Sequence, residues 1–569
     1  MVVVVKDGKV VAAQGYGVAD VETRRPMTAE RTLMNIASIK KLFEGIAIMQ
    51  LVEQGRLNLD QDVSAYLDFS IPTPQGGVPV TLRRLMTHRA GFEDVFKTSN
   101  RSFAERLPRR LFPYGDVPAY SNYGASLSGY ILARVSGSST SDYVTAHVLS
   151  PLGMTSSSFA VQPPPALTPL MATGYLVKPG SPPVRLDVHS TDLQLNTTGD
   201  DMARFIRAVL NGGVLDGRRI LRPATLATMM APQVAEPLSA MGLYFYQREV
   251  GGVRFIGHRG DTSVFQSDLL LQPENAFGLY VAYNAEGDGS PRDDLERALV
   301  ARYFTAPAKV VSPFVPRAAD ASAVAGWYER TRRSELNLFS VEELFTQRRI
   351  NADADGSIET GLAGWLVKDP ARTVWREIAP YIFEDRDGDK WAFERKRADL
   401  EILKTTDGTS GRERVSWYET ADFAQPLMAA SLAVMVLTLL SWPAAALWRR
   451  AGLGGMIATP GTRKRLAFIR IVLCIDLGVA AAVIWLVRAD WDQRQIFVDA
   501  LDPWLVALYA AAWLGVLATP VVLWLTYGLW KQSGIGVLAR IHYAMVGVAV
   551  TTAAWFAVAW HIAGTTLNY

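Results

Sequence analysis

The sequence predicts three parts: a mixed α/β domain, a small antiparallel β-barrel and four membrane-spanning α-helices. The first part alternates helical and strand patterns, and the second consists of short aromatic runs separated by turn signals. The third contains four apolar runs of about 20 residues each, the length that crosses a bilayer. The expected boundaries of α/β domain, linker, barrel and membrane part are 1–305, 306–317, 318–420 and 421–569.

Composition excludes some classes of function. The formal net charge is only +3, which gives no reason to expect binding to nucleic acid. The single cysteine, Cys474, lies in an apolar run, so no intrachain disulfide can form. The six histidines are scattered without the spacing of a zinc site, and we expect neither a metal nor a cofactor.

The chain opens with the pattern of a β-hairpin. Residues 2–5 and 10–13 are apolar runs, and between them lies Asp7-Gly8, a dipeptide that favours a tight hairpin turn. No charged segment, apolar segment and cleavage site precede the hairpin, so we see no secretory signal.

A buried helix is predicted over residues 39–54, because apolar residues recur there at helical spacing and Gly55 follows. Ser38 then lies in the first turn, where free backbone N–H groups favour an anion. Residues three apart share a helix face, so Lys41 can reach the Ser38 hydroxyl whereas Lys40 points away. A buried lysine can act as a base toward such a serine. The alternative is a serine helix cap followed by two solvated lysines.

The rest of the first domain mixes both kinds of pattern. Helices are predicted over residues 130–135 and 202–210. Strands are predicted over residues 253–256, 267–271 and 277–283.

Residues 318–420 predict a small antiparallel barrel, since short aromatic runs alternate there with Asp-Gly turns. The run 351–356 starts like a calcium loop. Leu362 stands where the loop needs its twelfth-position glutamate, so we predict a hairpin turn instead.

Two further motifs accompany Ser38 and Lys41: Tyr-Ser-Asn at residues 120–122 and His-Arg-Gly at residues 258–260. Ser-x-x-Lys, Tyr-x-Asn and a basic residue-x-Gly, in this order, resemble the serine β-lactamase and penicillin-binding protein superfamily. The closest resemblance is to its class C-like, esterase-like branch of β-lactamase-related serine hydrolases. Supporting segments across residues 1–305 are 49–55, 85–91, 151–154 and 201–205.

The resemblance implies an α/β (α+β) β-lactamase/DD-peptidase-like domain with a central antiparallel sheet and a helical subdomain. Some members carry a following small barrel and C-terminal membrane helices. In the implied mechanism Ser38 attacks a carbonyl to form an acyl-enzyme, Lys41 accepts its proton, and Tyr120 relays a proton to the leaving group.

The resemblance also implies a set of substrate-binding residues. Asn122 would orient the substrate amide and Lys41, and the backbone N–H groups of Ser38 and Asp261, which follows Gly260, would form the oxyanion hole. Alternate residues of a strand share a face, so His258 and Gly260 would face the cleft and Arg259 would not.

Three departures from the family pattern bear on the substrate. His258 stands where penicillin-recognising members have lysine, and a mostly neutral imidazole holds a substrate carboxylate less firmly. Asp261 carries a side chain where many relatives have glycine, which would narrow the cleft. The Glu-x-x-Leu-Asn motif of class A enzymes does not occur.

The four apolar runs cover residues 423–447, 466–487, 504–525 and 544–563. The first connection holds five basic residues, the second is mixed to acidic, and the third holds Lys531 and Arg540. The positive-inside rule then places the first and third connections in the cytoplasm and residues 1–420 outside it. The basic residues of the first connection are Arg449, Arg450, Arg463, Lys464 and Arg465.

Asp476 lies within the second apolar run and should face other helices or water, because a carboxylate is costly in lipid. The predicted export of residues 1–420 requires a signal, and we see none. The resemblance also implies a helix ahead of residue 2, which the sequence does not contain. We therefore expect further sequence upstream of Met1. Without that helix one face of the central sheet should be uncovered.

We therefore predict a multi-pass protein of the bacterial inner membrane with a periplasmic or extracellular catalytic domain. It would act as a serine hydrolase on esters, D-amino-acid peptides or β-lactam-like amides. Its partners would be a small-molecule or peptide substrate and the lipid bilayer. One alternative is a non-catalytic penicillin- or peptidoglycan-binding or sensing protein on the same scaffold. Another is a transport or lipid-handling role centred on the four helices.

Overall fold

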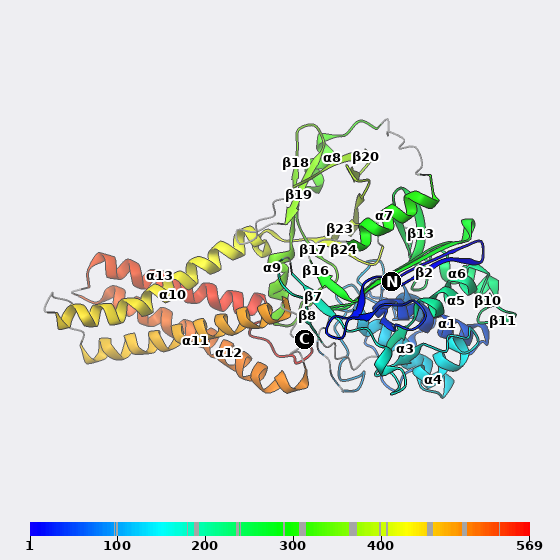
Figure 1. Ribbon diagram of the computed structural model, residues 1–569. Helices are drawn as coiled ribbons and strands as arrows, with labels where there is room; N and C mark the ends of the chain where they lie inside the picture. Colours follow the sequence, from blue (N-terminus) through cyan, green and yellow to red (C-terminus); the bar gives the residue numbers. More distant parts are fainter. Residues whose placement is uncertain are drawn as a thin grey trace.

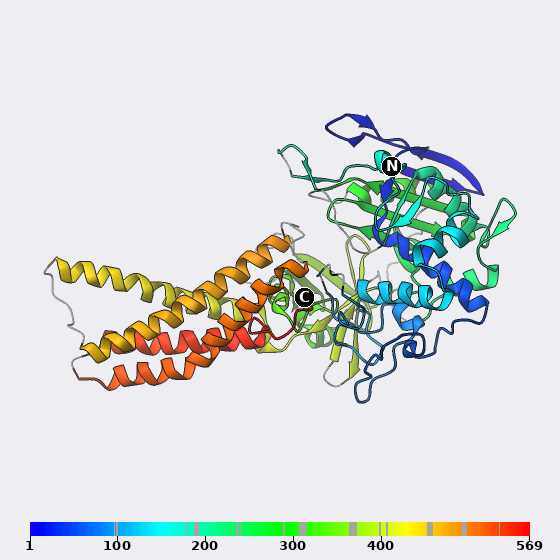
Figure 2. The same cartoon turned by 90° about the horizontal axis from the view of Figure 1, so that it is seen from below.

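Three parts follow one another along the chain and in space: an α/β domain, a barrel above it and a helical bundle projecting to one side (Figures 1 and 2). The C-terminus returns to the junction between bundle and barrel. The computed structural model describes all residues except 96, 98, 100, 179, 187–192, 235–237, 239, 288–290, 306–313, 363–371, 398–399, 406–407, 452–458, 492–497 and 534. Most of the expected linker lies outside the described residues.

A six-stranded antiparallel sheet forms the centre of the first part. Its strand order is β12-β13-β14-β15-β1-β2. The hairpin predicted at the start is present, and Asp7 and Gly8 both have positive φ, as its tight turn requires. The strands are β1 (Val2–Lys6), β2 (Lys9–Gln14), β12 (Tyr246–Val250), β13 (Val253–Asp261), β14 (Gln266–Gln272) and β15 (Phe277–Tyr283).

Helices cover the inner face of this sheet. The helices of this part are α1 (Lys40–Glu53), α2 (Leu82–Met86), α3 (Asn122–Ser136), α4 (Thr140–Val144), α5 (Gly199–Leu210), α6 (Pro223–Met230) and α7 (Pro291–Tyr303). Helix α1 is buried around most of its circumference, and Leu42, Phe43 and Ile46 are fully inaccessible to solvent. Each such side chain contributes about 1.5–3 kcal/mol to stability, so α1 is firmly fixed beneath the sheet.

The outer face of the sheet is covered in part by α7. Val300 packs there against a cluster that includes Phe255, Phe277 and Leu279. The expectation of an uncovered face is therefore wrong for β13 to β15. It holds only toward the sheet edge at β2, where Val10 and Val11 are 44% and 54% exposed.

The barrel predicted from the aromatic runs is a closed eight-stranded barrel. Trp375 stacks on Trp391 with ring centroids 4.1 Å apart, and both belong to its core. The run 351–356 forms the β18–β19 hairpin turn, as predicted. The strands are β17 (Gly326–Arg330), β18 (Arg348–Ala352), β19 (Ile358–Leu362), β20 (Thr373–Ala379), β21 (Ile382–Asp385), β22 (Lys390–Arg397), β23 (Leu400–Lys404) and β24 (Gly411–Arg414).

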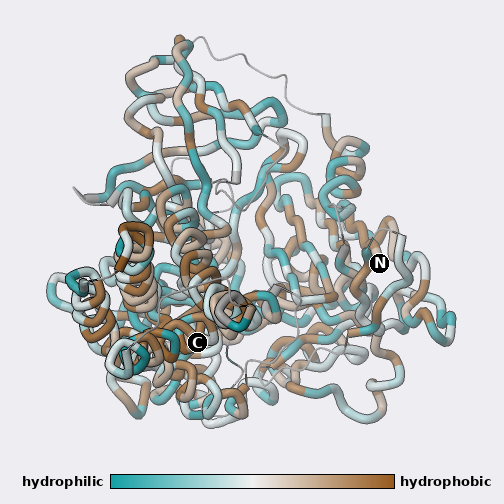
Figure 3. The backbone as a smooth tube through the Cα atoms, turned by 90° about the vertical axis from the view of Figure 1, so that its left-hand side faces the viewer, coloured by the Kyte–Doolittle hydropathy of each residue, from teal (hydrophilic) through white to brown (hydrophobic). Residues whose placement is uncertain are grey.

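Four helices long and apolar enough to cross a membrane form the bundle. Figure 3 views the molecule from the side of this bundle, whose tubes are largely brown. The fourth helix begins earlier than its apolar run and ends at Ala559, so Arg540 lies inside the helix and not in the third connection. The four helices are α10 (Ala421–Arg450), α11 (Pro460–Trp491), α12 (Asp502–Lys531) and α13 (Val537–Ala559).

The barrel and the bundle share a core. The segment between β17 and β18 contains η6 (Leu338–Glu342) and α9 (Glu343–Thr346). Leu338, Phe339 and Leu344 from this segment pack with residues of α10 to α13 and with Tyr569. The barrel therefore packs against one end of the bundle.

Candidate active site

Ser38 lies on a single turn of 3₁₀-helix, Ala37–Ile39, that leads directly into α1. Ala37 has a φ of +47°, a left-handed conformation that costs a non-glycine residue about 1–2 kcal/mol. The carboxamide oxygen of Asn35 accepts a hydrogen bond from the Ala37 N–H at 2.8 Å. This strained turn sets the direction in which the Ser38 side chain points.

Lys41 occupies the centre of the polar group around Ser38. Its side chain is almost fully buried, and Nζ donates hydrogen bonds to Ser38 Oγ at 2.9 Å and to Asn122 Oδ1 at 3.0 Å. Lys40 points elsewhere, and its Nζ donates to the carbonyl of Leu193. The helical spacing thus distinguishes the two lysines as the sequence predicts.

Tyr120 and Asn122 flank the start of α3. The Ser121 hydroxyl caps that helix by accepting a hydrogen bond from the Gly124 N–H at 3.0 Å, which turns Asn122 toward Lys41. The Lys41 ammonium lies 4.9 Å from the centroid of the Tyr120 ring. The structure thus brings the two predicted residues of this motif to Ser38 and Lys41.

His258 lies on β13 beside the same group. Its Nδ1 donates to the carbonyl of Arg259 at 2.5 Å when the ring is neutral, which leaves Nε2 as an acceptor. Burial, together with the nearby Lys41 ammonium, lowers the pKa of His258 to about 3. Arg259 points the other way and pairs with Asp268 at 2.9 Å. The imidazole is therefore neutral at pH 7 and provides no positive charge.

Gly260 permits β13 to approach the turn that carries Ser38. A Cβ at this position would lie 2.2 Å from the carbonyl oxygen of Ile36, closer than any side chain can tolerate. The Ser267 hydroxyl joins the two segments by donating to the carbonyls of Ile36 and Gly260, at 2.9 and 3.1 Å.

The side chain of Asp261 is held away from this contact. Arg292 of α7 pairs with its carboxylate at 2.5 Å, and the Asp261 side chain is 51% exposed. The sequence predicts that the Asp261 side chain narrows the cleft. In the structure its carboxylate is paired with Arg292 of α7.

Two residues of the site were not among those predicted. His88 stacks on Tyr120 with ring centroids 4.0 Å apart, and its Nδ1 accepts a hydrogen bond from the Ser121 N–H at 3.3 Å. Burial and the Lys41 ammonium hold the pKa of His88 well below its usual value, so this ring is neutral as well. Residues 85–91, which include His88, support the family resemblance but carry no local signal for its contact with Tyr120.

The second of these residues, Arg332, comes from the barrel. Its guanidinium lies 5.0 Å from the centroid of the Tyr120 ring, and its Nε donates to Asp94 Oδ2 at 2.6 Å. No local pattern around Arg332 links it to Ser38. The site is consequently shared between two parts of the chain.

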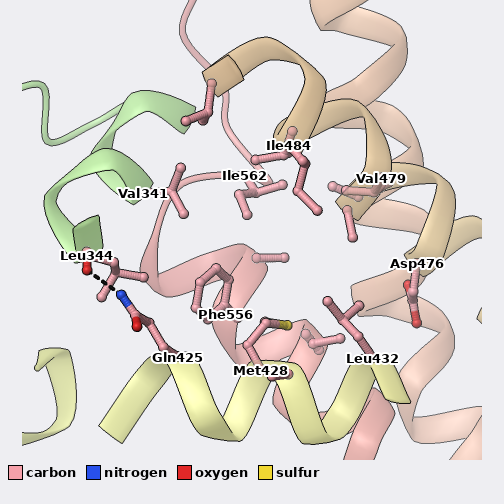
Figure 4. A pocket seen from close by; sticks show the side chains of 18 of the residues that line it. Val341, Leu344, Gln425, Met428, Leu432, Asp476, Val479, Ile484, Phe556 and Ile562 are labelled. Carbon is pink, nitrogen blue, oxygen red and sulfur yellow. Dashed lines mark hydrogen bonds between the residues drawn. The ribbon is translucent and has the colours of Figure 1, made fainter. Parts of the chain in front are cut away.

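The acidic residue of the second span faces the other helices. Asp476 reaches the wall of an apolar cavity of about 410 Å³ among the four helices and η6–α9 (Figure 4). A Cβ added at Gly515 of α12 would lie 2.2 Å from Asp476 Oδ1, so the carboxylate packs against the backbone of that helix. Near the barrel, Gln425 donates to the carbonyl of Leu344 at 2.6 Å.

The antiparallel sheet, the buried helix behind Ser38 and the Lys41–Tyr120–Asn122 group define a protein of the serine β-lactamase and penicillin-binding protein superfamily. The beta-lactamase family profile matches residues 1–304, just over half of the chain, and the chain belongs to that family.

Individual relatives share only a low sequence identity with this chain. Protein flp of Staphylococcus aureus (strain N315) is 27% identical over 311 residues, which cover 51% of this chain and 60% of the relative. The chain thus aligns with well under two thirds of that protein's length. The crystal structure of SurE is similar with a TM-score of 0.52 and 22% identity, covering 73% of this chain and 94% of SurE. The octameric penicillin-binding protein homologue from Pyrococcus abyssi has a TM-score of 0.46 and 21% identity, covering 73% of this chain and 95% of its own.

Proposed function

We propose that this protein is a membrane-anchored serine hydrolase that acts through an acyl-enzyme on Ser38. The observation that carries the proposal is the placement of the buried Lys41 ammonium between Ser38 Oγ and Asn122 Oδ1, 4.9 Å from the Tyr120 ring. A nucleophile, a base within hydrogen-bond reach and a group that orients the base form the pattern of covalent catalysis.

In the proposed reaction Lys41 acts as the free amine, having released its ammonium proton to solvent, and takes the hydroxyl proton as Ser38 Oγ attacks the substrate carbonyl. The backbone N–H groups of Ser38 and Asp261 stabilise the resulting oxyanion, since Gly260 brings β13 against the turn of Ser38. Tyr120 passes a proton to the leaving group as the tetrahedral intermediate collapses to the acyl-enzyme. Water then attacks the acyl carbonyl, the same groups return the proton to Ser38, and the acid is released.

Esters and D-amino-acid peptides are the proposed substrates, ahead of β-lactams. The neutral imidazole of His258 offers an acceptor, Nε2, at the position where lysine would offer a charge. A carboxylate next to the reacting amide, as β-lactams carry, gains no ionic partner from such a group.

The proposed location is the bacterial inner membrane, with the catalytic and barrel parts on the periplasmic or extracellular side. The basic residues of the first connection and Lys531 lie at the bundle end far from the barrel (Figure 1). Asp499 and Asp502 lie at the near end. The positive-inside rule favours the cytoplasm for the far end.

Replacement of Ser38 tests the catalytic proposal. Ser38→Ala should abolish hydrolysis of p-nitrophenyl esters and covalent labelling by a fluorophosphonate, with little change in melting temperature. Ser181→Ala, a replacement of an exposed serine, is the matched control and should retain both activities. Labelling that persists in Ser38→Ala contradicts the assignment.

The alternative proposal is a penicillin- or peptidoglycan-binding sensor that acylates without turnover. Its support is the buried ion pair of Lys97 with Asp502, which attaches the first domain to the bundle. A sensor would label once with a fluorescent penicillin and release the acyl group slowly, while a hydrolase would show continuous product formation with esters.

A further inference from the structure

The barrel contains a polar pocket at the end that adjoins the catalytic domain. The pocket has a volume of about 520 Å³, and Asp94 of the catalytic domain forms part of its wall. Trp391 and Phe339 provide apolar surface within it. The charged lining consists of the carboxylates Asp94, Glu342 and Glu343 and of five arginines: Arg330, Arg332, Arg333, Arg348 and Arg412.

Arg332 connects this pocket to the proposed catalytic group. It lines the pocket, and its guanidinium also lies 5.0 Å from the centroid of the Tyr120 ring, whose other cationic neighbour is Lys41 at 4.9 Å. The Arg332 side chain is 39% exposed, so it remains accessible to a bound molecule. Arg332 is therefore shared by the pocket wall and the surroundings of Tyr120.

Arg330, Arg332 and Arg333 are held by ion pairs with carboxylates. Arg330 pairs with Glu343 at 2.6 Å and Arg332 with Asp94 at 2.6 Å. Arg333 pairs with Glu413 and with Glu335, both at 2.9 Å. These pairs fix the guanidinium groups at the pocket wall.

Arg412 is placed differently. It lies directly opposite Arg330 in the β17–β24 ladder, and like charges at such a position destabilise a sheet. Its guanidinium donates to the carbonyl of Thr346 at 3.1 Å, which leaves its charge without neutralisation from that partner. Burial, together with Arg348 and Arg330, lowers the pKa of Arg412 to about 9, although the carboxylates of Glu343 and Glu329 offset part of this effect. An anion in the pocket would offset this repulsion.

The arginine side chain suits such an anion well. Its planar guanidinium binds oxyanions with two parallel hydrogen bonds, and charge-assisted bonds of this kind are roughly twice as strong as neutral ones. The Arg348 guanidinium lies 5.7 Å from the Trp391 ring, so an aromatic surface accompanies the cations.

We propose that the barrel pocket binds a carboxylate of the substrate, remote from the scissile carbonyl, through Arg412, Arg348 and Arg332. This inference rests on the proposed hydrolase function and names its substrate class: acyl compounds that carry a negative charge several bonds from the reacting carbonyl. The cation that His258 does not supply within the cleft is supplied by the barrel.

The test compares p-nitrophenyl esters of equal chain length with and without a terminal carboxylate. Mono-p-nitrophenyl esters of succinate, glutarate, adipate and suberate are assayed beside butyrate, valerate, hexanoate and octanoate, with the full chain in detergent. We expect kcat/KM to favour the carboxylate ester by about tenfold or more at one chain length, the equivalent of one charged hydrogen bond of about 1.5–3 kcal/mol.

Variants assign that preference to the pocket. Arg412→Gln and Arg348→Gln should each reduce the ratio of the two kcat/KM values about tenfold, mainly through KM for the carboxylate ester. Arg412→Lys keeps the charge and should retain part of the ratio. Arg395→Gln is the control, because Arg395 lies on β22 of the same barrel, is 70% exposed and does not line the pocket.

Binding to the Ser38→Ala protein tests the pocket independently of catalysis. Suberate and inorganic phosphate are titrated calorimetrically into that protein and into its Arg412→Gln derivative. We expect suberate to bind and the Arg412 replacement to abolish binding. Phosphate binding without dicarboxylate binding would identify a free-phosphate site and overturn the substrate proposal.

The two proposals fail in different ways. Hydrolysis of neutral esters with no carboxylate preference at any length, and no suberate binding, overturns this inference while leaving the hydrolase intact. Absence of all hydrolysis and of Ser38 labelling overturns the proposed function, and suberate binding then decides the pocket alone.

Discussion

Lys97 of the catalytic domain and Asp502 at the start of α12 form a buried ion pair between residues 405 positions apart in the sequence. Their side chains are 3% and 11% exposed. The Lys97 backbone N–H also donates to the carbonyl of Tyr569 at 2.5 Å, and the Tyr569 hydroxyl donates to Asp502 Oδ1 at 3.1 Å. The catalytic domain, the bundle and the C-terminal residue thus meet at this buried ion pair.

We predict that Lys97→Met destabilises the whole chain. Lys97 is one of two cations that pair with Asp502, the other being Arg101 at 2.5 Å, so its removal should cost part of the roughly 3–5 kcal/mol that a wholly unpaired buried charge costs. Thermal unfolding in detergent measures the loss. The double variant Lys97→Met/Asp502→Leu should regain most of it, whereas Arg297→Gln, which breaks the exposed pair with Asp294, should be nearly silent. A double variant as unstable as the single one would contradict the prediction.

We predict unequal effects from the two neighbouring lysines. Lys41→Ala should slow acylation of Ser38 by about 10²–10⁴-fold, because it removes the positioned base. Lys40→Ala should have little effect, since its Nζ bonds the Leu193 carbonyl. Stopped-flow measurement of the acylation burst with an activated ester separates the two. Equal losses in both variants would show that Lys41 is not the base.

We predict that His258 makes stability depend on pH. Its pKa is about 3 in the folded chain and 6.5 as the ordinary value, so between these limits the unfolded chain binds a proton that the folded chain does not. The contribution of His258 to the free energy of unfolding is complete above pH 6.5 and falls by about 1.4 kcal/mol for each pH unit below pH 6.5. The melting temperature should therefore fall between pH 6.5 and 4.5, and less steeply in His258→Asn. An equal pH dependence in both proteins would refute this account.

We predict that cephalosporins are poorer substrates than neutral p-nitrophenyl esters. The β-lactam carboxylate lies beside the reacting amide, where the neutral His258 replaces a permanent cation. His258→Lys should shift the ratio of kcat/KM values toward the β-lactam. Faster hydrolysis of cephalosporins than of the esters by the unaltered protein would be incompatible with this assignment.

We predict that the end of α11 near the barrel lies outside the cytoplasm. A reporter enzyme that is active only in the periplasm should be active when fused after Arg488 and inactive when fused after Arg463. The reason is the accumulation of basic residues at the far end of the bundle. The opposite pattern of reporter activity would invert the topology.

The sequence predicts most elements because their signals are local. The spacing of Ser38 and Lys41, the glycine after α1 and the alternation along β13 each lie within a few residues. The hydropathy pattern finds four spans but misplaces the fourth. Arg540 and His542 precede the apolar run 544–563, although the helix already begins at Val537 and includes them.

Contacts between distant residues escape such reasoning. Arg332 reaches Tyr120 only because the barrel closes over the catalytic domain, and Arg330 faces Arg412 only because the first and last strands of the barrel pair. The stacking of His88 on Tyr120 likewise depends on the packing of two loops. None of these contacts has a periodicity or motif in the sequence that could reveal it.

The shared core of barrel and bundle means that residues 1–420 cannot be separated from the four helices by cutting the chain before α10. Such a cut would remove both carboxylates that Lys97 pairs with, Asp499 and Asp502, and would expose Phe339 and Leu344 to water. Asp94, three residues before Lys97, holds the arginine that lies beside Tyr120. Without the four helices, residues 1–420 would thus lose contacts that support the group around Ser38, so the helices contribute to the candidate site although none of their side chains reaches Tyr120 through a described contact.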